Sequence, residues 1–160
     1  MKGDRKVLDY LNDALRHELT AVNQYWLHYR LLDNWGINDL AKKWRAESIE
    51  EMRHADALIA RILFLEGAPN MQALDALHVG QGVKDVLEND LRAEVAARAL
   101  YAEAATYCQG VPDYASRDLF ETLIRDEEGH IDFLETQIDL IGRLGVDLYT
   151  QHHIGKPEKA

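Results

Sequence analysis

Glutamate and histidine residues recur in this chain with a fixed offset of 76 residues, and this repeat constrains the fold more than any other feature. Each half of the chain has one Glu and, 33 residues later, a Glu-x-x-His motif. The six residues are Glu18, Glu51, His54, Glu94, Glu127 and His130. Chance gives about half of one Glu-x-x-His motif in such a chain, so one motif alone would be weak. Two motifs with matched upstream glutamates indicate the same half-site twice.

The residues around the repeat follow helical spacing. Between residues 4 and 34, apolar residues alternate steps of three and four and draw one stripe on a helix. Glu18 lies on this stripe, where an apolar residue is expected. The same reasoning places Asn38 and Asp113 as helix N-caps and Gly67 just after a helix end. The predicted helices span about 4–34, 38–65, 83–109, 113–143 and, as a short fifth helix, 146–153.

The turns place the two half-sites at one height. Glu18 and Glu51 are equidistant from the turn at 34–36, and Glu94 and Glu127 are equidistant from the turn at 110–112. The segment 66–82 is too long for an idle loop but can run back along a helix of about 42 Å. We therefore expect one all-α domain over residues 1–160, a four-helix bundle with one long crossover and a short fifth C-terminal helix.

Composition restricts the class of protein. At 160 residues and 47% hydrophobic residues, the chain can bury the core of one domain. No apolar run approaches the about 18 residues of a membrane span, and we expect a cytoplasmic protein. The net charge of −10 argues against nucleic acid or an anionic membrane as partner and suits a protein that gathers cations. The single cysteine, Cys108, excludes an internal disulfide and a Cys-x-x-Cys iron centre.

Four glutamates at one level of an apolar core need positive charge to stay ionised. No Lys or Arg lies on the helix stripes, whereas two divalent cations balance four carboxylates. Oxygen-rich ligation with one imidazole per metal favours iron or manganese over structural zinc. The simplest assignment makes Glu51 and Glu127 bridges between the two metals, although these roles could be exchanged. Glu18 and His54 then complete one metal site, and Glu94 and His130 complete the second.

From Met1 to about His153 the chain resembles the bacterioferritins. Besides the six residues of the repeat, the segments 23–28 and 34–36 resemble that family's first helix and turn, and Met52 lies where its haem ligand is found. The resemblance implies a ferritin-like fold and a b-type haem shared by two subunits through Met52 across a two-fold axis. From the sequence alone, Met52 would sooner be a packing or interface residue. The resemblance also implies a 24-subunit homo-oligomeric shell of two-fold dimers and a ferredoxin-type electron donor for iron release.

The expected activity is that of a ferroxidase in iron storage, with two iron ions per subunit. Ferrous iron would be oxidised with O2 or H2O2, and ferric mineral would be deposited in the shell. Tyr25 lies two helical turns from Glu18 on the same stripe, where it could donate an electron or a hydrogen bond, and a core tyrosine is the alternative. Tyr101, its repeat partner, carries the same hypothesis with less support.

Other acidic and histidine residues allow weaker predictions. Glu47, Glu50 and Glu121 could guide iron on the inner surface, or they could be charges of a solvated helix face. Ala46 stands where some bacterioferritins have a histidine of an inner-surface iron site. The C-terminal pair His152 and His153 resembles a region that lines a shell channel, with a frayed chain end as the alternative.

Two other functions use the same ligands. A ferritin-like enzyme could oxidise an organic substrate or destroy peroxide, but it would need a substrate cavity or an electron-donor domain. A non-enzymatic shell or haem-carrying subunit with an idle metal centre is the second alternative.

Overall fold

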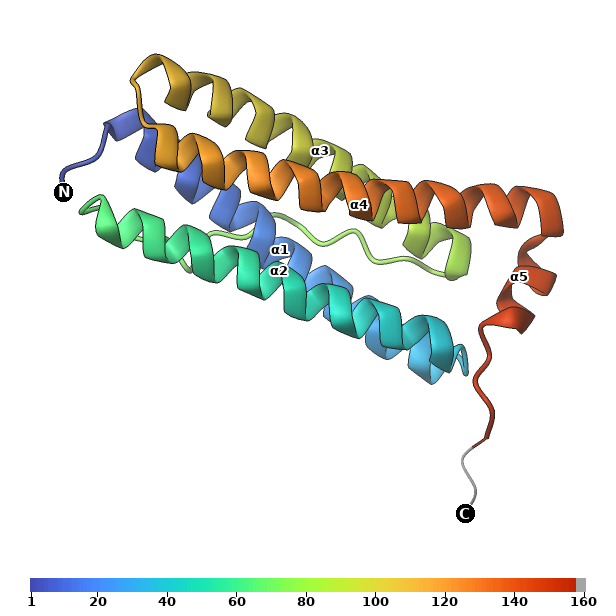
Figure 1. The fold of residues 1–160 in the computed structure, drawn as a ribbon. Coiled ribbons are helices and arrows are strands. Elements are labelled where there is room, and N and C mark those ends of the chain that lie inside the picture. The colour runs from blue at the N-terminus through green and yellow to red at the C-terminus, as the bar shows by residue number, and fades with distance from the viewer. Residues whose placement is uncertain (158–160) are drawn as a thin grey trace.

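The computed structural model describes residues 1–157, within which the chain forms five helices and no strand (Figure 1). The helices are α1 (Arg5–Asn34), α2 (Asn38–Phe64), α3 (Val83–Gly110), α4 (Tyr114–Leu144) and α5 (Val146–His152). Every helix end lies within one residue of the predicted range. Within the described residues, none of the helices combines the length and apolar composition that a membrane-spanning helix requires.

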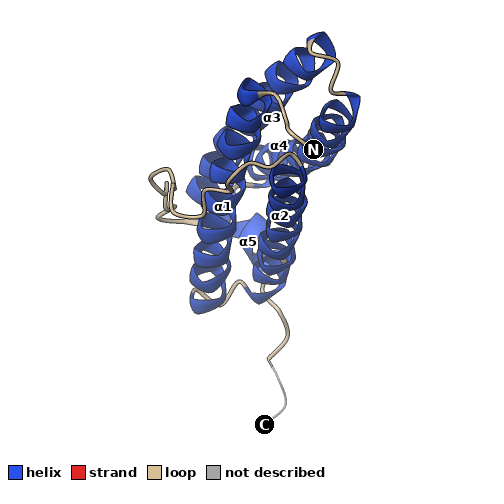
Figure 2. Ribbon diagram, turned by 90° about the vertical axis from the view of Figure 1, so that its left-hand side faces the viewer, coloured by secondary structure: helices blue, strands red, loops and turns tan. Residues whose placement is uncertain are grey.

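The four long helices form two antiparallel hairpins, α1 with α2 and α3 with α4, and α5 lies across one end of the bundle (Figure 1). Between the hairpins, the chain from 65 to 82 returns along the length of the bundle beside α1 (Figures 1 and 2). This return makes α2 and α3 parallel. The predicted class, a ferritin-like four-helix bundle with one long crossover and a short C-terminal helix, is confirmed.

Side-chain caps fix two of the helix starts, and the prediction was wrong at two other helix ends. The Asp4 carboxylate accepts from the backbone N–H groups of α1, and Asp113 caps α4 as predicted. Asn38 is not a cap, because Ile37 takes that position and the Asn38 amide instead donates to Asp33 at 2.8 Å. After α2 the left-handed residue is Glu66, with φ 61°, rather than Gly67.

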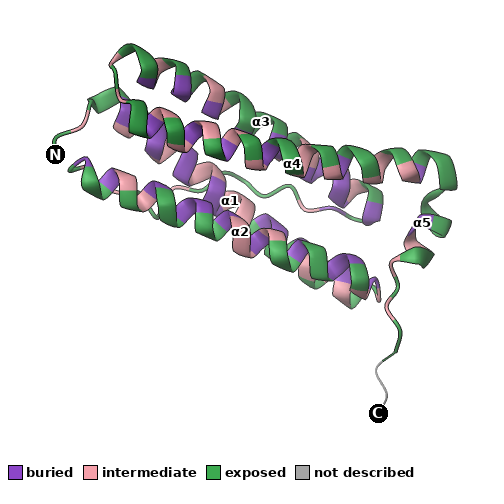
Figure 3. Ribbon diagram, in the orientation of Figure 1, coloured by how far each residue is buried: buried purple, intermediate pink, exposed green. Residues whose placement is uncertain are grey.

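The inward faces of the helices are buried along the whole bundle (Figure 3). One apolar cluster surrounds Leu11, Leu58 and Phe120 towards the end that holds the N-terminus. A second surrounds Leu32, Trp44 and Leu87 towards the end that holds α5. The six repeat residues occupy the level between these clusters, so that apolar packing on both sides holds them in one polar layer.

The end of the described chain is packed rather than frayed as far as His153. Gly145, with φ 80°, turns the chain between α4 and α5. The His153 ring lies 4.4 Å from the Tyr149 ring, and its carbonyl accepts from Asp39 N–H at 3.0 Å. Fraying was therefore the wrong alternative for this residue.

Candidate metal centre

All six repeat residues come together at the middle of the bundle, one or two from each long helix. Glu18 lies on α1, Glu51 and His54 on α2, Glu94 on α3, and Glu127 and His130 on α4. The four glutamates are at most 2% exposed. Glutamates this deeply buried require hydrogen bonds or counter-charges.

The six side chains form two groups of four that share two members. Glu18, Glu51, His54 and Glu127 offer ligand atoms within 4.8 Å of one another, and so do Glu51, Glu94, Glu127 and His130. Glu51 and Glu127 thus lie between two candidate positions. This is the geometry that their assignment as bridging ligands requires.

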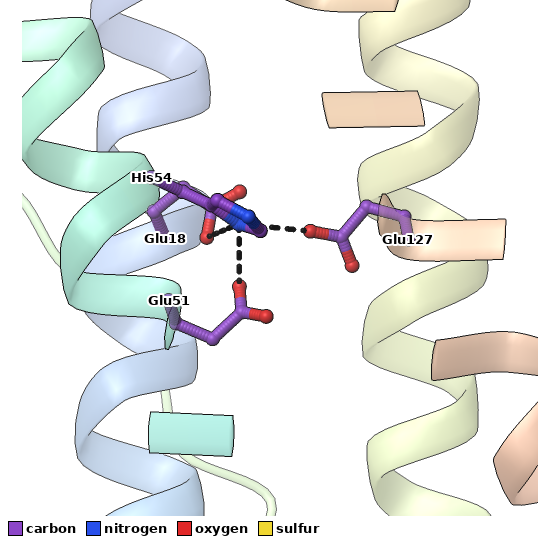
Figure 4. A group of neighbouring side chains, drawn as sticks. All are labelled: Glu18, Glu51, His54 and Glu127. Atoms are coloured by element: carbon purple, nitrogen blue, oxygen red, sulfur yellow. Dashed lines mark ion pairs between the residues drawn. The ribbon is translucent and has the colours of Figure 1, made fainter. Parts of the chain in front are cut away.

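Each histidine directs its Nδ1 atom into the cluster. His54 Nδ1 lies 3.5 Å from Glu18 Oε2, 3.7 Å from Glu51 Oε2 and 3.6 Å from Glu127 Oε1 (Figure 4). His130 Nδ1 lies 3.1 Å from Glu51 Oε1 and 3.4 Å from Glu94 Oε1. Separations of 3.1 to 3.7 Å leave room for a cation bound by ring nitrogen and carboxylate oxygen at about 2 Å each.

The outer nitrogen of each ring meets a carboxylate that sequence reasoning did not connect with it. His54 Nε2 lies 3.1 Å from Asp126 Oδ2, and His130 Nε2 lies 2.7 Å from Glu47 Oε2. Such outer contacts orient imidazole ligands and raise their basicity. Glu47 also pairs with Lys43 and its side chain is only 16% exposed, so the prediction of a surface acid was wrong for this residue. The repeat alone could not reveal the contact, because its offset matches Glu47 with Leu123.

Two tyrosines tie the hairpins together through the glutamates. Tyr25 on α1 donates a hydrogen bond to Glu94 on α3, and Tyr101 on α3 donates one of 2.5 Å to Glu18 on α1. Both tyrosines are buried. The two contacts are related by the same repeat as the glutamates, so Tyr101 has the same structural role as Tyr25.

Several buried ligand atoms have no hydrogen-bond partner. They are Glu18 Oε2, Glu51 Oε1, both Glu127 carboxylate oxygens and the Nδ1 atoms of His54 and His130. Buried polar atoms are almost always satisfied in folded proteins. Six of the eight such buried side-chain atoms in the described residues belong to the cluster, and these anionic oxygens and imidazole nitrogens are a donor set that fits divalent iron or manganese.

In the absence of metal, bound protons have to balance the negative charge of the buried glutamates. Burial and the neighbouring Glu18 charge raise the pKa of Glu51 well above its usual value. Burial opposes charge on His130, but the neighbouring carboxylates of Glu127 and Glu47 outweigh it and raise the pKa of His130 to about 12. The pKa of His54 is raised for the same reasons, with Glu127 and Glu18 as its partners. Cations that bind here must displace these protons.

A second buried polar network lies one helical turn from Glu94. The Asp90 carboxylate, 0% exposed, accepts from Gln24 at 2.7 Å and Trp44 at 2.7 Å, and its Oδ2 lies 2.9 Å from His28 Nδ1. Sequence reasoning missed this network. The signal it offered was the acidic Asp90 on the inward stripe of α3, four residues before Glu94.

Met52 lies beside the cluster in sequence but faces away from it. Its side chain is 40% exposed on α2, and Trp26 on α1 is 41% exposed. Leu19, by contrast, is buried and belongs to the apolar cluster around Leu11. Two large exposed apolar side chains mark a face that suits a further contact.

Comparison with known proteins agrees with this geometry. A model of the ferritin-like domain matches residues 8–144. A bacterioferritin of Brucella melitensis is 57% identical over 160 residues, covering 100% of this chain and 99% of the relative. A bacterioferritin of Rhodobacter capsulatus is 61% identical over 145 residues, covering 91% and 90%. A solved structure of Rhodobacter capsulatus bacterioferritin, described with a metal-free dinuclear site and haem iron in a crystallographic special position, superposes with a TM-score of 0.98 at 56% identity over 100% of both chains.

Proposed function

Because this chain belongs to the bacterioferritin family, we propose that it stores iron and that its Glu and His cluster is a ferroxidase centre. The centre would oxidise two ferrous ions per chain to ferric ions with O2 or H2O2. The observation that carries the proposal is the pair of four-residue groups that share Glu51 and Glu127. Two cations held side by side by shared carboxylates can be oxidised together.

The glutamates supply the chemistry that favours oxidation. Their hard, anionic oxygens bind Fe(III) more strongly than Fe(II), which lowers the reduction potential of the bound substrate. Glu18 and His54 would hold one ferrous ion, and Glu94 and His130 the other. The surrounding apolar clusters exclude bulk water and strengthen each of these contacts.

The tyrosines and outer carboxylates position the ligands. Tyr101 holds Glu18 Oε1 and leaves Glu18 Oε2 without a hydrogen bond, whereas Tyr25 holds Glu94 Oε1, the oxygen that lies 3.4 Å from His130 Nδ1. Asp126 and Glu47 fix the rings of His54 and His130 with Nδ1 inward. Tyr25 would in addition be placed to donate an electron near the centre.

Met52 would bind haem b together with the same residue of a second subunit. A group on a two-fold axis meets identical surfaces of two chains, so one methionine from each chain would hold it. The exposed thioether beside Trp26 fits this role, since an apolar macrocycle would cover both side chains. The haem would supply a redox group for electron transfer when it is bound.

The assembly would be a homo-oligomeric shell, of 24 subunits by family analogy, in the cytoplasm. Ferric mineral would fill its interior, and a ferredoxin-type donor would supply the electrons for release. The acidic net charge of −10 suits a shell that attracts ferrous ions.

An anaerobic ferrous titration followed by addition of O2 tests the proposal. We expect a break at two iron ions per chain and rapid oxidation of both. Glu127→Gln should remove the break, whereas the matched control Glu128→Gln should keep it, because the Glu128 side chain is exposed and pairs with Arg98 rather than with the cluster. A wild-type protein with no break would instead be a shell subunit with an idle centre.

A further inference from the structure

The Asp90 side chain is a buried carboxylate that three side-chain N–H groups contact. It is 0% exposed and accepts from Gln24 and Trp44 at 2.7 Å each. Its Oδ2 atom also lies 2.9 Å from His28 Nδ1. An indole nitrogen is a donor only, so the Trp44 contact requires an acceptor on Asp90. Hydrogen bonds from three donors favour the ionised form of this carboxylate.

None of the three donors brings a positive charge. The Gln24 amide is neutral, and its Oε1 accepts a crossover backbone N–H at 2.9 Å, so its nitrogen faces Asp90. The His28 ring is neutral too, because its Nε2 accepts a crossover backbone N–H at 2.9 Å and its one proton is therefore on Nδ1. Within the described residues, no lysine or arginine forms an ion pair with Asp90. The core therefore holds a negative charge in contact with the Trp44 indole.

The Trp44 ring also borders the candidate metal centre. Trp44 is 2% exposed on α2, about one turn before Glu47, whose Oε2 lies 2.7 Å from His130 Nε2. The indole lines a small gap in the packing together with Tyr25, Glu94 and His130. It is therefore adjacent both to the buried anion and to two of the metal ligands.

A buried negative charge beside an indole makes the ring easier to oxidise. Loss of one electron leaves a positive charge on the ring, and the carboxylate stabilises this charge because the protein interior screens it poorly. The carboxylate can also accept the N–H proton along the existing hydrogen bond. Tyr25 differs, since its phenol donates to Glu94, a metal ligand. Oxidation of Trp44 therefore leaves the protonation of the ligands unchanged.

We propose that Trp44 donates an electron to the metal centre and that Asp90 accepts the indole proton. This inference rests on the proposed function, which it deepens for a chain that holds only one ferrous ion. H2O2 then takes up two electrons, and two protons from solvent, and gives two water molecules. One electron comes from the ferrous ion, which becomes ferric. The other comes from the indole, which becomes a neutral radical as its proton passes to Asp90.

A ferrous ion that arrives later restores the indole. It gives one electron to the Trp44 radical and becomes ferric, and the proton returns from Asp90 to the ring nitrogen. In sum, one H2O2 and two protons oxidise two ferrous ions and give two water molecules. Trp44 thus completes the two-electron reduction of peroxide in a chain with a single ion, and no one-electron product of peroxide is released.

Electron paramagnetic resonance of rapidly frozen samples tests the inference. Metal-free protein is loaded anaerobically with one ferrous ion per chain and mixed with H2O2. We expect a transient radical whose hyperfine splitting narrows when ring-deuterated tryptophan is incorporated. Trp44→Phe should lose this signal. The matched control Trp35→Phe should keep it, because Trp35 lies in the turn after α1 and is 38% exposed.

Asp90→Asn tests the role of the carboxylate. The amide keeps the size of the side chain but removes the charge and the proton acceptor, so the tryptophan signal should be lost although Trp44 is present. Circular dichroism checks that each variant is folded. A preserved tryptophan signal in folded Asp90→Asn would contradict the role of Asp90.

A measurement without a change at Trp44 or Asp90 decides the case if those variants misfold. In Trp26→Phe/Trp35→Phe, Trp44 is the only tryptophan that remains. Incorporation of a polyfluorinated tryptophan, which keeps the shape of the ring but is harder to oxidise, should remove the signal there.

Two outcomes would overturn the inference. One is a full tryptophan signal in Trp44→Phe, and the other is a wild-type protein that oxidises the bound iron rapidly without any tryptophan radical. Failure of the wild-type protein to oxidise bound ferrous iron would instead contradict the proposed function.

Discussion

The Tyr101 phenol donates a hydrogen bond of 2.5 Å to Glu18 Oε1, across the boundary between the two helical hairpins. Its repeat partner Tyr25 does the same for Glu94 in the opposite direction. Each hairpin thus orients the terminal carboxylate of the other. The centre depends on both hairpins being docked, and neither hairpin holds a complete site.

Tyr101→Phe should therefore weaken one metal position more than the other. Loss of the phenol frees Glu18, and loss of an outer partner commonly lowers metal affinity about tenfold or more. Anaerobic Co(II) titration should change from one tight phase for two ions to a tight phase and a weak phase. The control Tyr107→Phe removes a phenol that binds the surface residue Asp4 and should leave the titration unchanged.

Tyr25→Phe separates positioning from electron donation. If Tyr25 donates an electron, this variant loses a transient radical during oxidation that Tyr101→Phe retains. Unchanged oxidation kinetics together with no radical in the wild-type protein would remove Tyr25 from the mechanism and leave it as a hydrogen-bond donor.

The metal-free protein should lose stability as pH rises above neutral. His130 has a folded pKa of about 12 against an ordinary 6.5, and the pKa of His54 is also raised. A group whose pKa is higher in the folded than in the unfolded protein stabilises the fold fully at pH values below its unfolded pKa. This stabilisation is lost as the pH rises towards the folded pKa. The raised pKa of Glu51 likewise makes the free energy of unfolding smaller as the pH rises. Urea unfolding of chelator-treated protein should give a smaller free energy of unfolding at about pH 9 than at about pH 6.5.

Divalent metal should reverse this trend, because metal binding releases the same protons. In weakly buffered solution near pH 7, Co(II) should release protons as it binds, and its affinity should rise with pH. An equal or larger free energy of unfolding of the metal-free protein at the higher pH, or metal binding without proton release, would contradict the protonation that we assign to the cluster.

Met52→Leu should abolish haem binding while leaving the ferroxidase centre intact. Leucine keeps the apolar volume but has no sulfur to bind iron. Protein reconstituted with haem should show the spectrum of bis-methionine ligation, and the variant should not. The control Met71→Leu changes a methionine of the crossover, 49% exposed, and should bind haem normally. Retention of the same spectrum by Met52→Leu would exclude this residue as the ligand.

The sequence predicted the fold well because periodic signals determine it. The apolar stripes gave the helices, and the equal distances of Glu18 and Glu51 from their turn predicted the level at which they meet. The helix ends were less certain. Asn38 has a capping side chain, but Ile37 is the cap because the short turn after Asn34 positions the backbone first. At this helix start, the backbone geometry of the hairpin overrides the preference of Asn38 for the N-cap position.

The site was predicted only as far as the repeat extends. Glu47 matches Leu123 in the repeat, so the internal comparison carried no signal for its contact with His130, whereas Asp126 matches the acidic Glu50, a signal that was not used. The contacts of Gln24 and His28 with the backbone at His78 and Gly80 depend on the path of the crossover, which lacks periodicity. Contacts made by irregular backbone follow from the folded path, and spacing in the sequence does not encode them.

The most direct test of the account is a crystal structure of protein soaked anaerobically in ferrous iron, with anomalous scattering measured at the iron edge. We predict two iron peaks per chain. One should lie among Glu18, Glu51, His54 and Glu127, and the other among Glu51, Glu94, Glu127 and His130. A single peak, or peaks only on the protein surface with the buried carboxylates free of metal, would contradict the dinuclear centre.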